Sequence, residues 1–289
     1  MHCVFDVGLA KLTRHEVGQS ALLWRSMPTG EQDVLTGRTY LTRVQYRTDV
    51  NLAARQAIYA YQQPRIDLAK TVLDLAGLSG AEAIADIGCG NGAYLAELAR
   101  RDHAGRVVGV DLSAGMLSAA SGRAPDAALL VGDAAALPMA DDAVDVAMAM
   151  HMLYHVPDRL AAVQELRRVT RNGGRALVVL NGADHLAELR DLILAATRDI
   201  GLSARDTWAE EYLLDSGAAL LASVFGSVER HDIAAGLVVP DRAPVLDYIR
   251  SVFVAQALPD PEQLVNAAAR RLPVGEWRIK THSGLLICR

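Results

Sequence analysis

Between residues 82 and 180, short apolar runs alternate with stretches of helical periodicity. Strands are expected at the apolar runs, which are 83–87, 106–110, 128–131, 144–150 and 176–180. Helices are expected between them, over 92–101, 114–121 and 158–170. Strands that are almost continuously apolar are buried on both faces, and intervening helices let such strands run parallel. The pattern therefore predicts an α/β fold with a doubly wound, mostly parallel sheet.

The two flanks of this core are mainly helical. Before the core, apolar residues at spacings of three and four predict helices over 52–61 and 66–76, with Gly77 as a stop signal. After the core, the expected helices and strands are 185–200, 208–225, 227–233, 244–255, 261–271 and 283–288. The chain is thus divided into an N-terminal extension (1–38), a helical lid (39–80), the core (81–181) and a C-terminal part of the same domain (182–289).

Composition narrows the class of protein. The chain has 289 residues, of which 51% are hydrophobic, and its formal net charge of -5 argues against a nucleic-acid binder. No apolar run approaches the ~18 residues of a membrane span, and no secretory signal is visible at the N-terminus. Cys3, Cys89 and Cys288 form neither a disulfide framework nor a CxxC metal site. We expect a cytoplasmic monomer or homodimer without a metal centre.

A glycine-rich loop at the end of the first core strand is the most specific signal. It reads Asp86-Ile87-Gly88-Cys89-Gly90-Asn91-Gly92, and its glycines let a ligand approach the backbone closely. Asp111 follows the second strand and Asp133 the third. The carboxyl ends of parallel strands form the crevice where nucleotides bind, so these groups are expected on one rim. A carboxylate at Asp111 is placed to accept both hydroxyl hydrogens of a ribose.

An NAD(P)-dependent oxidoreductase is an alternative, because Gly88, Gly90 and Ala93 also satisfy the dinucleotide spacing. Asp86 argues against it, since a carboxylate beside this loop would repel a pyrophosphate. In addition, no tyrosine is followed four positions later by a lysine. A ligand that combines a ribose with a cationic or zwitterionic end suits the loop better.

With these motifs the chain resembles the class I S-adenosylmethionine-dependent methyltransferases, in particular the small-molecule branch that includes quinone-biosynthesis enzymes. The resemblance covers residues 40–181 well and the C-terminal third loosely. Besides the glycine loop it rests on Asp111-Leu112-Ser113 with Met116, Gly132-Asp133-Ala134, Leu137-Pro138, Asp145-Val146, 152–158, 166–169 and Gly173-Gly174. It implies a Rossmann-like sheet of seven strands and S-adenosylmethionine as the cofactor. It also implies an acceptor pocket formed by the segments before the first core strand and after the fifth, including the helices of 182–289.

The resemblance also implies the roles of individual residues. The glycine loop would lie under the methionine and ribose of the cofactor, and Asp111 would bind the ribose hydroxyls. Met116 would pack on the adenine, and Asp133 with Ala134 would meet the adenine edge. Tyr46 and Arg55 lie in a stretch similar to a cofactor lid and would reach the cofactor carboxylate. The complete expected cofactor set is Asp86, Gly88, Gly90, Gly92, Asp111, Leu112, Met116, Asp133, Ala134, Tyr46 and Arg55.

Methyl transfer from a sulfonium is an in-line displacement that needs a general base only if the acceptor must lose a proton. The candidate catalytic residues are His151, Tyr154 and His155, just beyond the fourth core strand. If this segment is helical, their spacing puts all three on one face, and His151 is the first choice. The alternative for His155 is a packed structural histidine, and for Tyr154 a side chain that covers the sheet.

Aromatic residues gather in the flanks. The chain has 3 Trp, 8 Tyr and 3 Phe, and only Tyr94 and Tyr154 lie between residues 80 and 180. Those expected to wall the acceptor pocket are Trp24, Tyr40, Tyr46, Tyr59, Tyr61, Trp208, Tyr212, Tyr248 and Phe253. They favour a small aromatic or heteroaromatic acceptor of specialised metabolism, such as an indole, phenol or amine. The alternatives are that they only pack the added helices, or that the chain is a methyltransferase-fold cyclase or regulator.

Overall fold

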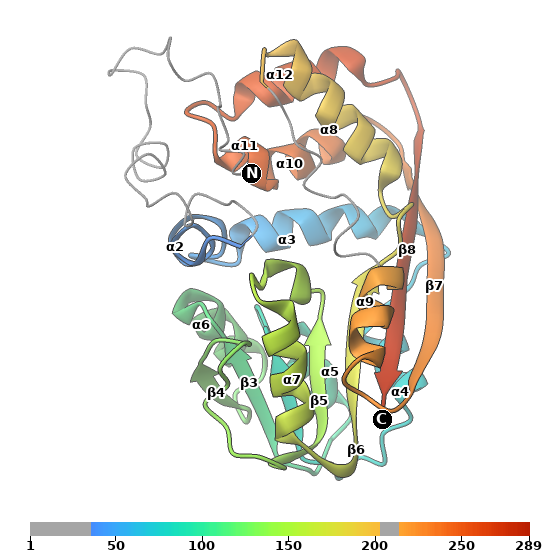
Figure 1. Ribbon diagram of the computed structural model, residues 1–289. Coiled ribbons are helices and arrows are strands. Elements are labelled where there is room, and N and C mark those ends of the chain that lie inside the picture. The colour runs from blue at the N-terminus through green and yellow to red at the C-terminus, as the bar shows by residue number, and fades with distance from the viewer. Residues whose placement is uncertain (1–35, 203–213) are drawn as a thin grey trace.

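The computed structural model describes residues 36–202 and 214–289 (Figure 1). Its central sheet has eight strands in the order β1-β7-β8-β6-β5-β2-β3-β4. The parallel strands are β2 (Ile84–Ile87), β3 (Val107–Asp111), β4 (Ala128–Val131), β5 (Val144–Met150) and β6 (Thr170–Asn181). The α/β class and the mostly parallel sheet agree with the sequence prediction.

The remaining strands extend the sheet beyond β6. Strand β8 (Trp277–Cys288) runs antiparallel to both β6 and β7 (Val228–Val239). The expected seven strands are therefore β2 to β8. An eighth, β1 (Gln62–Gln63), has two residues and pairs with the outer edge of β7. A pairing this short leaves no hydrophobic pattern that a sequence could reveal.

Helices cover both faces of the parallel strands. On one face, α7 (Arg159–Val169) and α9 (Leu214–Ala222) share a hydrophobic cluster with Ala147 and Val178. The opposite face is covered by α4 (Leu68–Ala76), α5 (Ala93–Arg100) and α6 (Ala114–Arg123). Met148 and Leu177 are the sequence neighbours of Ala147 and Val178, and they point to this second layer. Because strands in the middle of the sheet are buried on both sides, their residues are apolar without interruption.

Two helix ends show how far local signals hold. As predicted, Gly77 ends α4 in the left-handed conformation, with φ 59°. The helix expected over 158–170 is α7, which ends one residue earlier, at Val169, and residues 170–181 already form β6. The backbone turns extended at Thr170, whose hydroxyl donates 2.7 Å to Leu166 O and closes the last helical turn.

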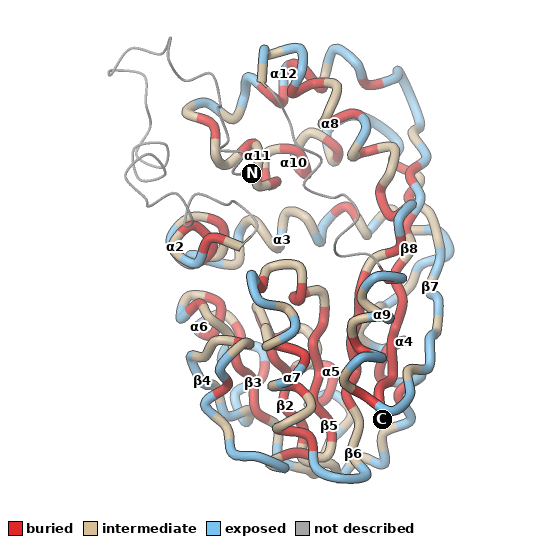
Figure 2. Tube along the Cα trace, viewed as in Figure 1, coloured by how far each residue is buried: buried red, intermediate tan, exposed pale blue. Residues whose placement is uncertain are grey.

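A cap of helices lies above the carboxyl edge of the sheet. It is formed by α2 (Arg38–Tyr40), the π-helix η3 (Leu41–Gln45), α3 (Val50–Ala57), the 3₁₀ helix η4 (Ile58–Tyr61), α8 (Ala187–Asp199), α10 (Ala243–Ser251), α11 (Phe253–Gln256) and α12 (Glu262–Arg271). In Figure 1, α3 crosses between the sheet below and the other cap helices above, and Figure 2 shows buried residues in both layers. The cap has its own core, which includes Ile58, Leu237, Leu264 and Ile279.

Strands β7 and β8 join the cap to the sheet, and they are longer than predicted. Strands were expected only over 227–233 and 283–288, which are the halves that lie nearer to β6, whereas the other halves extend beside the cap. In the cap halves, exposed residues such as Arg278 and Lys280 alternate with Ile279 and Thr281, which are buried. A one-sided strand alternates in this way, and a search for continuous apolar runs passes over it.

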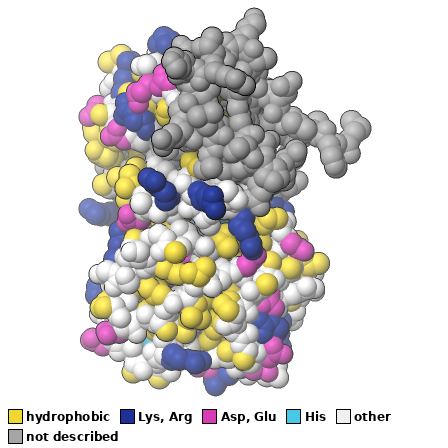
Figure 3. All heavy atoms as spheres, turned by 90° about the vertical axis from the view of Figure 1, so that its left-hand side faces the viewer, with side chains coloured by type: hydrophobic (Ala, Val, Ile, Leu, Met, Phe, Trp, Pro, Cys, Tyr) yellow, Lys and Arg dark blue, Asp and Glu magenta, His cyan; other side chains and the backbone are white. Residues whose placement is uncertain are grey.

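The surface near the cap carries basic side chains. On the face drawn in Figure 3, Lys and Arg gather in a band across the middle, at the height of α2 and η3. Arg38, Arg43 and Arg47 are exposed residues of this segment.

In the described part of the chain, no helix is both long enough and apolar enough to cross a membrane.

Candidate functional site

A cavity of about 640 Å³ follows the carboxyl edge of the sheet beneath the cap. Strand by strand, it is lined by Asp133 after β4, Asp111 at the end of β3, Gly88 after β2, His151 after β5 and Asn181 at the end of β6. The parallel strands all present the same end to this edge, so a long cavity meets a polar group from each of them.

The cavity brings together nearly all residues of the expected cofactor set. Those that line it are Tyr46, Arg55, Asp86, Gly88, Gly90, Asp111, Leu112, Met116, Asp133 and Ala134. Gly92 does not. It has φ 78°, and an added Cβ would lie 3.0 Å from both Cα and Cβ of Ala120, so this glycine lets α5 begin against α6. That the lining residues bind a cofactor stays a prediction.

Asp111 organises the turn between β3 and α6. Its Oδ2 accepts a hydrogen bond of 2.8 Å from Gly90 N, and its Oδ1 accepts one of 2.8 Å from Ser113 N. Burial raises the pKa of Asp111, and the backbone donors act in the opposite direction. Ser113 caps α6 by accepting from Met116 N at 3.3 Å and donates 2.7 Å to Tyr46 O. The carboxylate, the glycine loop and the lid are thus one connected unit.

The buried carboxylate of Asp86 has no hydrogen-bond partner in the described part of the chain. The residue is 1% exposed, and neither oxygen has a hydrogen-bond partner among the described residues. Burial, with a smaller contribution from the charge of Asp111, raises the pKa of Asp86 to about 8. An unpaired buried carboxylate is costly unless a ligand supplies a cation or donors. Asn91 Nδ2 and the Tyr94 hydroxyl also line the cavity and are likewise buried without a partner in the described chain.

The lid places a guanidinium on the cavity wall. Arg55 donates 3.2 Å to the Tyr46 hydroxyl and 2.7 Å to Ser251 O in α10. Its charge lies 5.5 Å from the ring centre of Tyr46 and 5.3 Å from that of Phe253. The Tyr46 hydroxyl is also 2.9 Å from His155 Nε2. At the β4 end, Arg38 at the start of α2 forms an ion pair with Asp133.

The prediction that His151, Tyr154 and His155 share one helical face is wrong. His151 has φ 55° and lies outside the 3₁₀ helix η5, which spans only Leu153–His155. Pro157 follows at once and cannot continue a helix. All three side chains nevertheless line the cavity.

The two histidines of this segment have different surroundings. His155 is held by Tyr46 and by edge contacts with the rings of Tyr154 and Phe253. The ring of His151 has no hydrogen-bond partner within the described residues, and burial lowers its pKa to about 4. His151 is therefore the neutral imidazole that is available to a ligand.

Of the flanking aromatics, Tyr46, Tyr59, Tyr248 and Phe253 line the cavity. Tyr40 and Tyr61 do not: Tyr40 is 1% exposed and donates 3.1 Å to Phe253 O, and Tyr61 packs on the cap core. Trp24, Trp208 and Tyr212 lie outside the described residues.

Sequence reasoning did not single out His185. It also lines the cavity, where its Nε2 is 3.0 Å from the Tyr59 hydroxyl. The only signal was its place a few residues after the end of β6. Over residues 36–202 and 214–289, no three or more His, Cys, Asp and Glu side chains form a group that could hold a metal ion.

Comparisons with known proteins place the sheet among methyltransferases. A family model described as a methyltransferase domain matches residues 85–178. A demethylmenaquinone methyltransferase of Beutenbergia cavernae is 38% identical over 109 residues, which are 38% of this chain and 45% of that protein. An uncharacterised methyltransferase of Mycobacterium bovis is 30% identical over 188 residues, which are 65% of this chain and 71% of that protein.

A solved structure agrees with these sequence matches. It is a protein of Bacillus halodurans that was determined as a candidate methyltransferase, with a TM-score of 0.56 and 17% identity. The match covers 78% of this chain and 99% of that one, and at this identity it supports the fold alone. The chain spans about half the length of the first curated relatives that it matches.

Proposed function

We propose a reaction for this chain from one premise: it belongs to the class I S-adenosylmethionine-dependent methyltransferases. The reaction is the transfer of the sulfonium methyl group of S-adenosylmethionine to a small acceptor. The acceptor is aromatic or heteroaromatic, such as an indole, a phenol or an amine, and belongs to specialised metabolism. The name of the Beutenbergia relative, which refers to demethylmenaquinone, supports a small-molecule acceptor.

The unpaired carboxylate of Asp86 is the observation that carries the proposal. Asp86 and Asp111 give the middle of the cavity two acidic groups, of which Asp86 is without any protein partner in the described chain. A cationic amino-acid end meets this requirement, because its ammonium supplies donors and positive charge. The pyrophosphate of a nicotinamide dinucleotide supplies no positive charge and is unfavourable beside this acidic pair. The site therefore favours a methyltransferase over the oxidoreductase alternative.

Other lining residues fit the remaining parts of the same cofactor. Asp111 would accept the ribose hydroxyls, and Met116 would pack on the adenine. Asp133 and Ala134 would meet the adenine edge. For this contact, Asp133 would give up its ion pair with Arg38 and bind the ligand instead. Arg55, held between two aromatic rings, would bind the cofactor carboxylate.

When bound, the cofactor supplies an electrophilic methyl group, and the chain itself orients the acceptor and excludes water. His151 stands between the cofactor end of the edge and the strands β6 and β8. Because its pKa is lowered to about 4, His151 is neutral at physiological pH and can accept a hydrogen bond from an N–H or O–H group. It is a weak base, so it suits acceptors that need orientation more than deprotonation, such as an indole.

A labelled-transfer assay tests the proposal. The purified chain is incubated with methyl-labelled S-adenosylmethionine and a panel of indoles, phenols and amines, and products are identified by mass spectrometry. We expect one added methyl group on at least one acceptor, and a loss of turnover in His151→Gln with unchanged cofactor affinity. Cofactor binding without any transfer would favour the cyclase or regulatory alternative, and binding of NAD(P) in its place would favour the oxidoreductase.

The location and assembly of the protein stay predictions. The thiols of Cys89 and Cys288 are buried and free of disulfides, which supports the proposed cytoplasmic location. A chain that forms a monomer or homodimer and binds no nucleic acid remains our expectation.

A further inference from the structure

The cavity continues beyond β5, past the ends of the strands that carry most of the cofactor residues. We call this part the acceptor half and define it by His151, Asn181, His185, Tyr59 and Tyr248, which all line the cavity. The cofactor set lies at the ends of β2, β3 and β4 and in the lid, whereas Asn181 ends β6 and His185 follows it. A molecule that meets the methyl group from this side would contact these side chains.

His185 has a fixed tautomer. Its Nδ1 accepts a hydrogen bond of 3.0 Å from the backbone N–H of His282, so Nδ1 carries no proton. Burial lowers the pKa of His185 to about 3, and the nearby His151 acts in the same direction. The ring is therefore neutral, and its single proton must be on Nε2. At 3.0 Å, Nε2–H donates to the Tyr59 hydroxyl oxygen.

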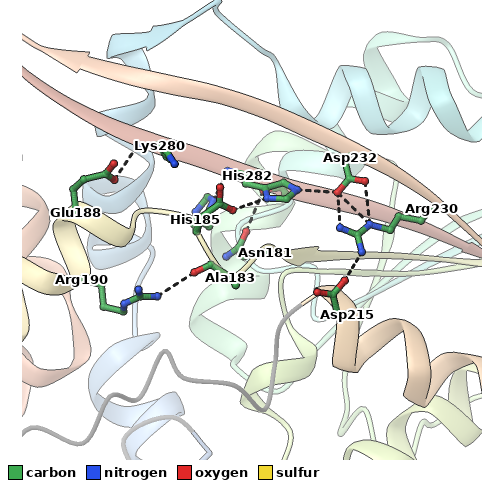
Figure 4. A network of polar contacts seen from close by, with 12 residues as sticks. Asn181, Ala183, His185, Glu188, Arg190, Asp215, Arg230, Asp232, Lys280 and His282 are labelled. Atoms are coloured by element: carbon green, nitrogen blue, oxygen red, sulfur yellow. Dashed lines mark hydrogen bonds and ion pairs between the residues drawn. The ribbon is translucent and has the colours of Figure 1, made fainter.

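The loop that carries His185 is fastened to β8 and β7 (Figure 4). The ring of His282 bonds Asp184 with Nδ1 at 2.7 Å and Asp232 of β7 with Nε2 at 2.8 Å. The two carboxylates raise the pKa of His282. In addition, Gly182 N donates 3.0 Å to His282 O. The imidazole of His185 is thus held from both ends of its loop, which preorganises the bond to Tyr59.

The Tyr59 hydroxyl is a hydrogen-bond donor without an acceptor among the described residues. Since its oxygen accepts from His185, its own O–H must donate elsewhere. Among residues 36–202 and 214–289, His185 Nε2 is its sole hydrogen-bond partner. Burial raises the pKa of Tyr59 strongly, so the hydroxyl stays protonated. The hydroxyl lies on the wall of the cavity, where a ligand atom in the acceptor half could accept this hydrogen bond.

We propose that Tyr59, oriented by His185, selects methyl acceptors that carry a hydrogen-bond-accepting atom, such as a carbonyl oxygen or a neutral ring nitrogen. Tyr59 is then a specificity-determining residue and His185 a positioning residue. The inference rests on the proposed function, because it assigns the acceptor half to the methyl acceptor. Removal of the donor leaves the ligand atom unpaired, which reduces affinity by about five- to tenfold for a neutral hydrogen bond.

Matched probe pairs test this inference in the full chain saturated with S-adenosylhomocysteine. Each pair has the same shape with and without the accepting atom: 1-indanone and indane, 1-tetralone and tetralin, quinoline and naphthalene. Affinities are measured by ligand-observed NMR at pH 7.5, where quinoline is neutral. We expect the accepting member to bind about five- to tenfold more tightly in at least one pair, and this preference to fall below about twofold in Tyr59→Phe.

Further variants separate a specific loss of the ligand preference from a general loss of structure. Tyr61→Phe removes a hydroxyl from the same 3₁₀ helix but outside the cavity, and should keep the preference. His185→Phe removes the donor to Tyr59 and should lose the preference, whereas His185→Gln, whose amide can still donate, should retain part of it. Unfolding temperatures show that each variant is folded.

Failure of the proposed function and failure of the inference on Tyr59 give different results. If the wild-type chain does not bind S-adenosylhomocysteine, the proposed function itself fails. If it binds this compound but shows no preference in any pair, binds none of the probes, or keeps its preference in Tyr59→Phe, the inference on Tyr59 is overturned and the proposed function is untouched.

Discussion

Asp111 Oδ2 accepts a 2.8 Å hydrogen bond from the backbone amide of Gly90, and this contact joins the ends of β3 and β2. The glycine loop is therefore shaped by the carboxylate that we propose as the ribose ligand. Because the second oxygen is bound to Ser113 N, the whole turn is in place before a ligand arrives. Preorganisation of this kind reduces the entropy that binding must overcome.

Protonation of Asp86 should be linked to cofactor binding. Its pKa of about 8 in the free protein means that Asp86 is protonated at pH 6.5, whereas a bound cation favours the carboxylate. We expect wild-type binding of S-adenosylmethionine at pH 6.5 to release about one proton. Calorimetry in buffers of different ionisation enthalpy measures this number. Asp86→Asn should bind more weakly and release close to none, and equal release in both proteins would contradict the assignment.

The buried histidines should make the protein sensitive to acid. Burial lowers the pKa of His185 to about 3 and of His151 to about 4, from 6.5 in the unfolded chain. The unfolded state thus binds more protons, so the stability that they contribute is present above pH 6.5 and is lost as the pH falls toward 4. Between pH 4.5 and 6, the free energy of unfolding should depend less steeply on pH in His185→Gln than in the wild type. The difference between the two slopes should be about 1.4 kcal/mol per pH unit.

Urea unfolding at several pH values, followed by tryptophan fluorescence, measures this slope. Asp86 contributes with the opposite sign, because its raised pKa makes the native state bind the additional proton, and the variant leaves that contribution unchanged. An identical slope in His185→Gln and in the wild type would show that His185 is not buried as a neutral ring.

Arg55 of the lid should contribute to the affinity for S-adenosylmethionine through its position and not through its charge alone. Arg55→Ala is expected to weaken S-adenosylmethionine binding about tenfold, or ~1.4 kcal/mol, because a charge-assisted hydrogen bond to the cofactor carboxylate is lost. Arg43→Ala removes an equal charge from an exposed position of the same lid and serves as the control. Titration calorimetry compares the two, and similar losses in both would indicate only a long-range effect of charge.

Gly88 should be intolerant of any side chain. It has φ 68°, and an added Cβ would lie 2.7 Å from Cβ of Met152. We expect Gly88→Ala to destabilise the protein by about 3 kcal/mol, from left-handed strain together with overpacking. Gly122, near the end of α6, has nothing within 4 Å of its added Cβ. Gly122→Ala should therefore stabilise the protein slightly, and thermal unfolding that shows the same sign for both would refute the loop geometry.

The sequence predicted the parallel core well because its strands are short apolar runs, and an apolar run is a local signal. Strands β4 and β5 begin and end where their apolar runs do, and Asp86, Asp111 and Asp133 reach the rim because each follows such a run. The helix expected from residue 158 also has a local cause, because Asp158 accepts from Ala161 N at 3.0 Å and caps α7.

What escaped prediction depends on contacts between distant parts of the chain. The role of His185 follows from the amide of His282, 97 residues away, and from Tyr59 in the lid. No spacing reveals which tautomer such a contact imposes. Likewise, His151 looked like the first residue of a helical face, but its backbone is left-handed, with φ 55°, where the chain leaves β5. The boundaries between the four segments of the chain remain predictions.

The affinity of S-adenosylmethionine for the wild-type chain and for Asp111→Ala, measured by titration calorimetry, tests the central claim most directly. We expect saturable binding by the wild type and a loss of about 30-fold, or ~2 kcal/mol, in the variant, since hydrogen bonds to a carboxylate are lost. Asp126→Ala, at an exposed turn before β4, should bind like the wild type. No binding by the wild type, or full affinity in Asp111→Ala, would contradict the account.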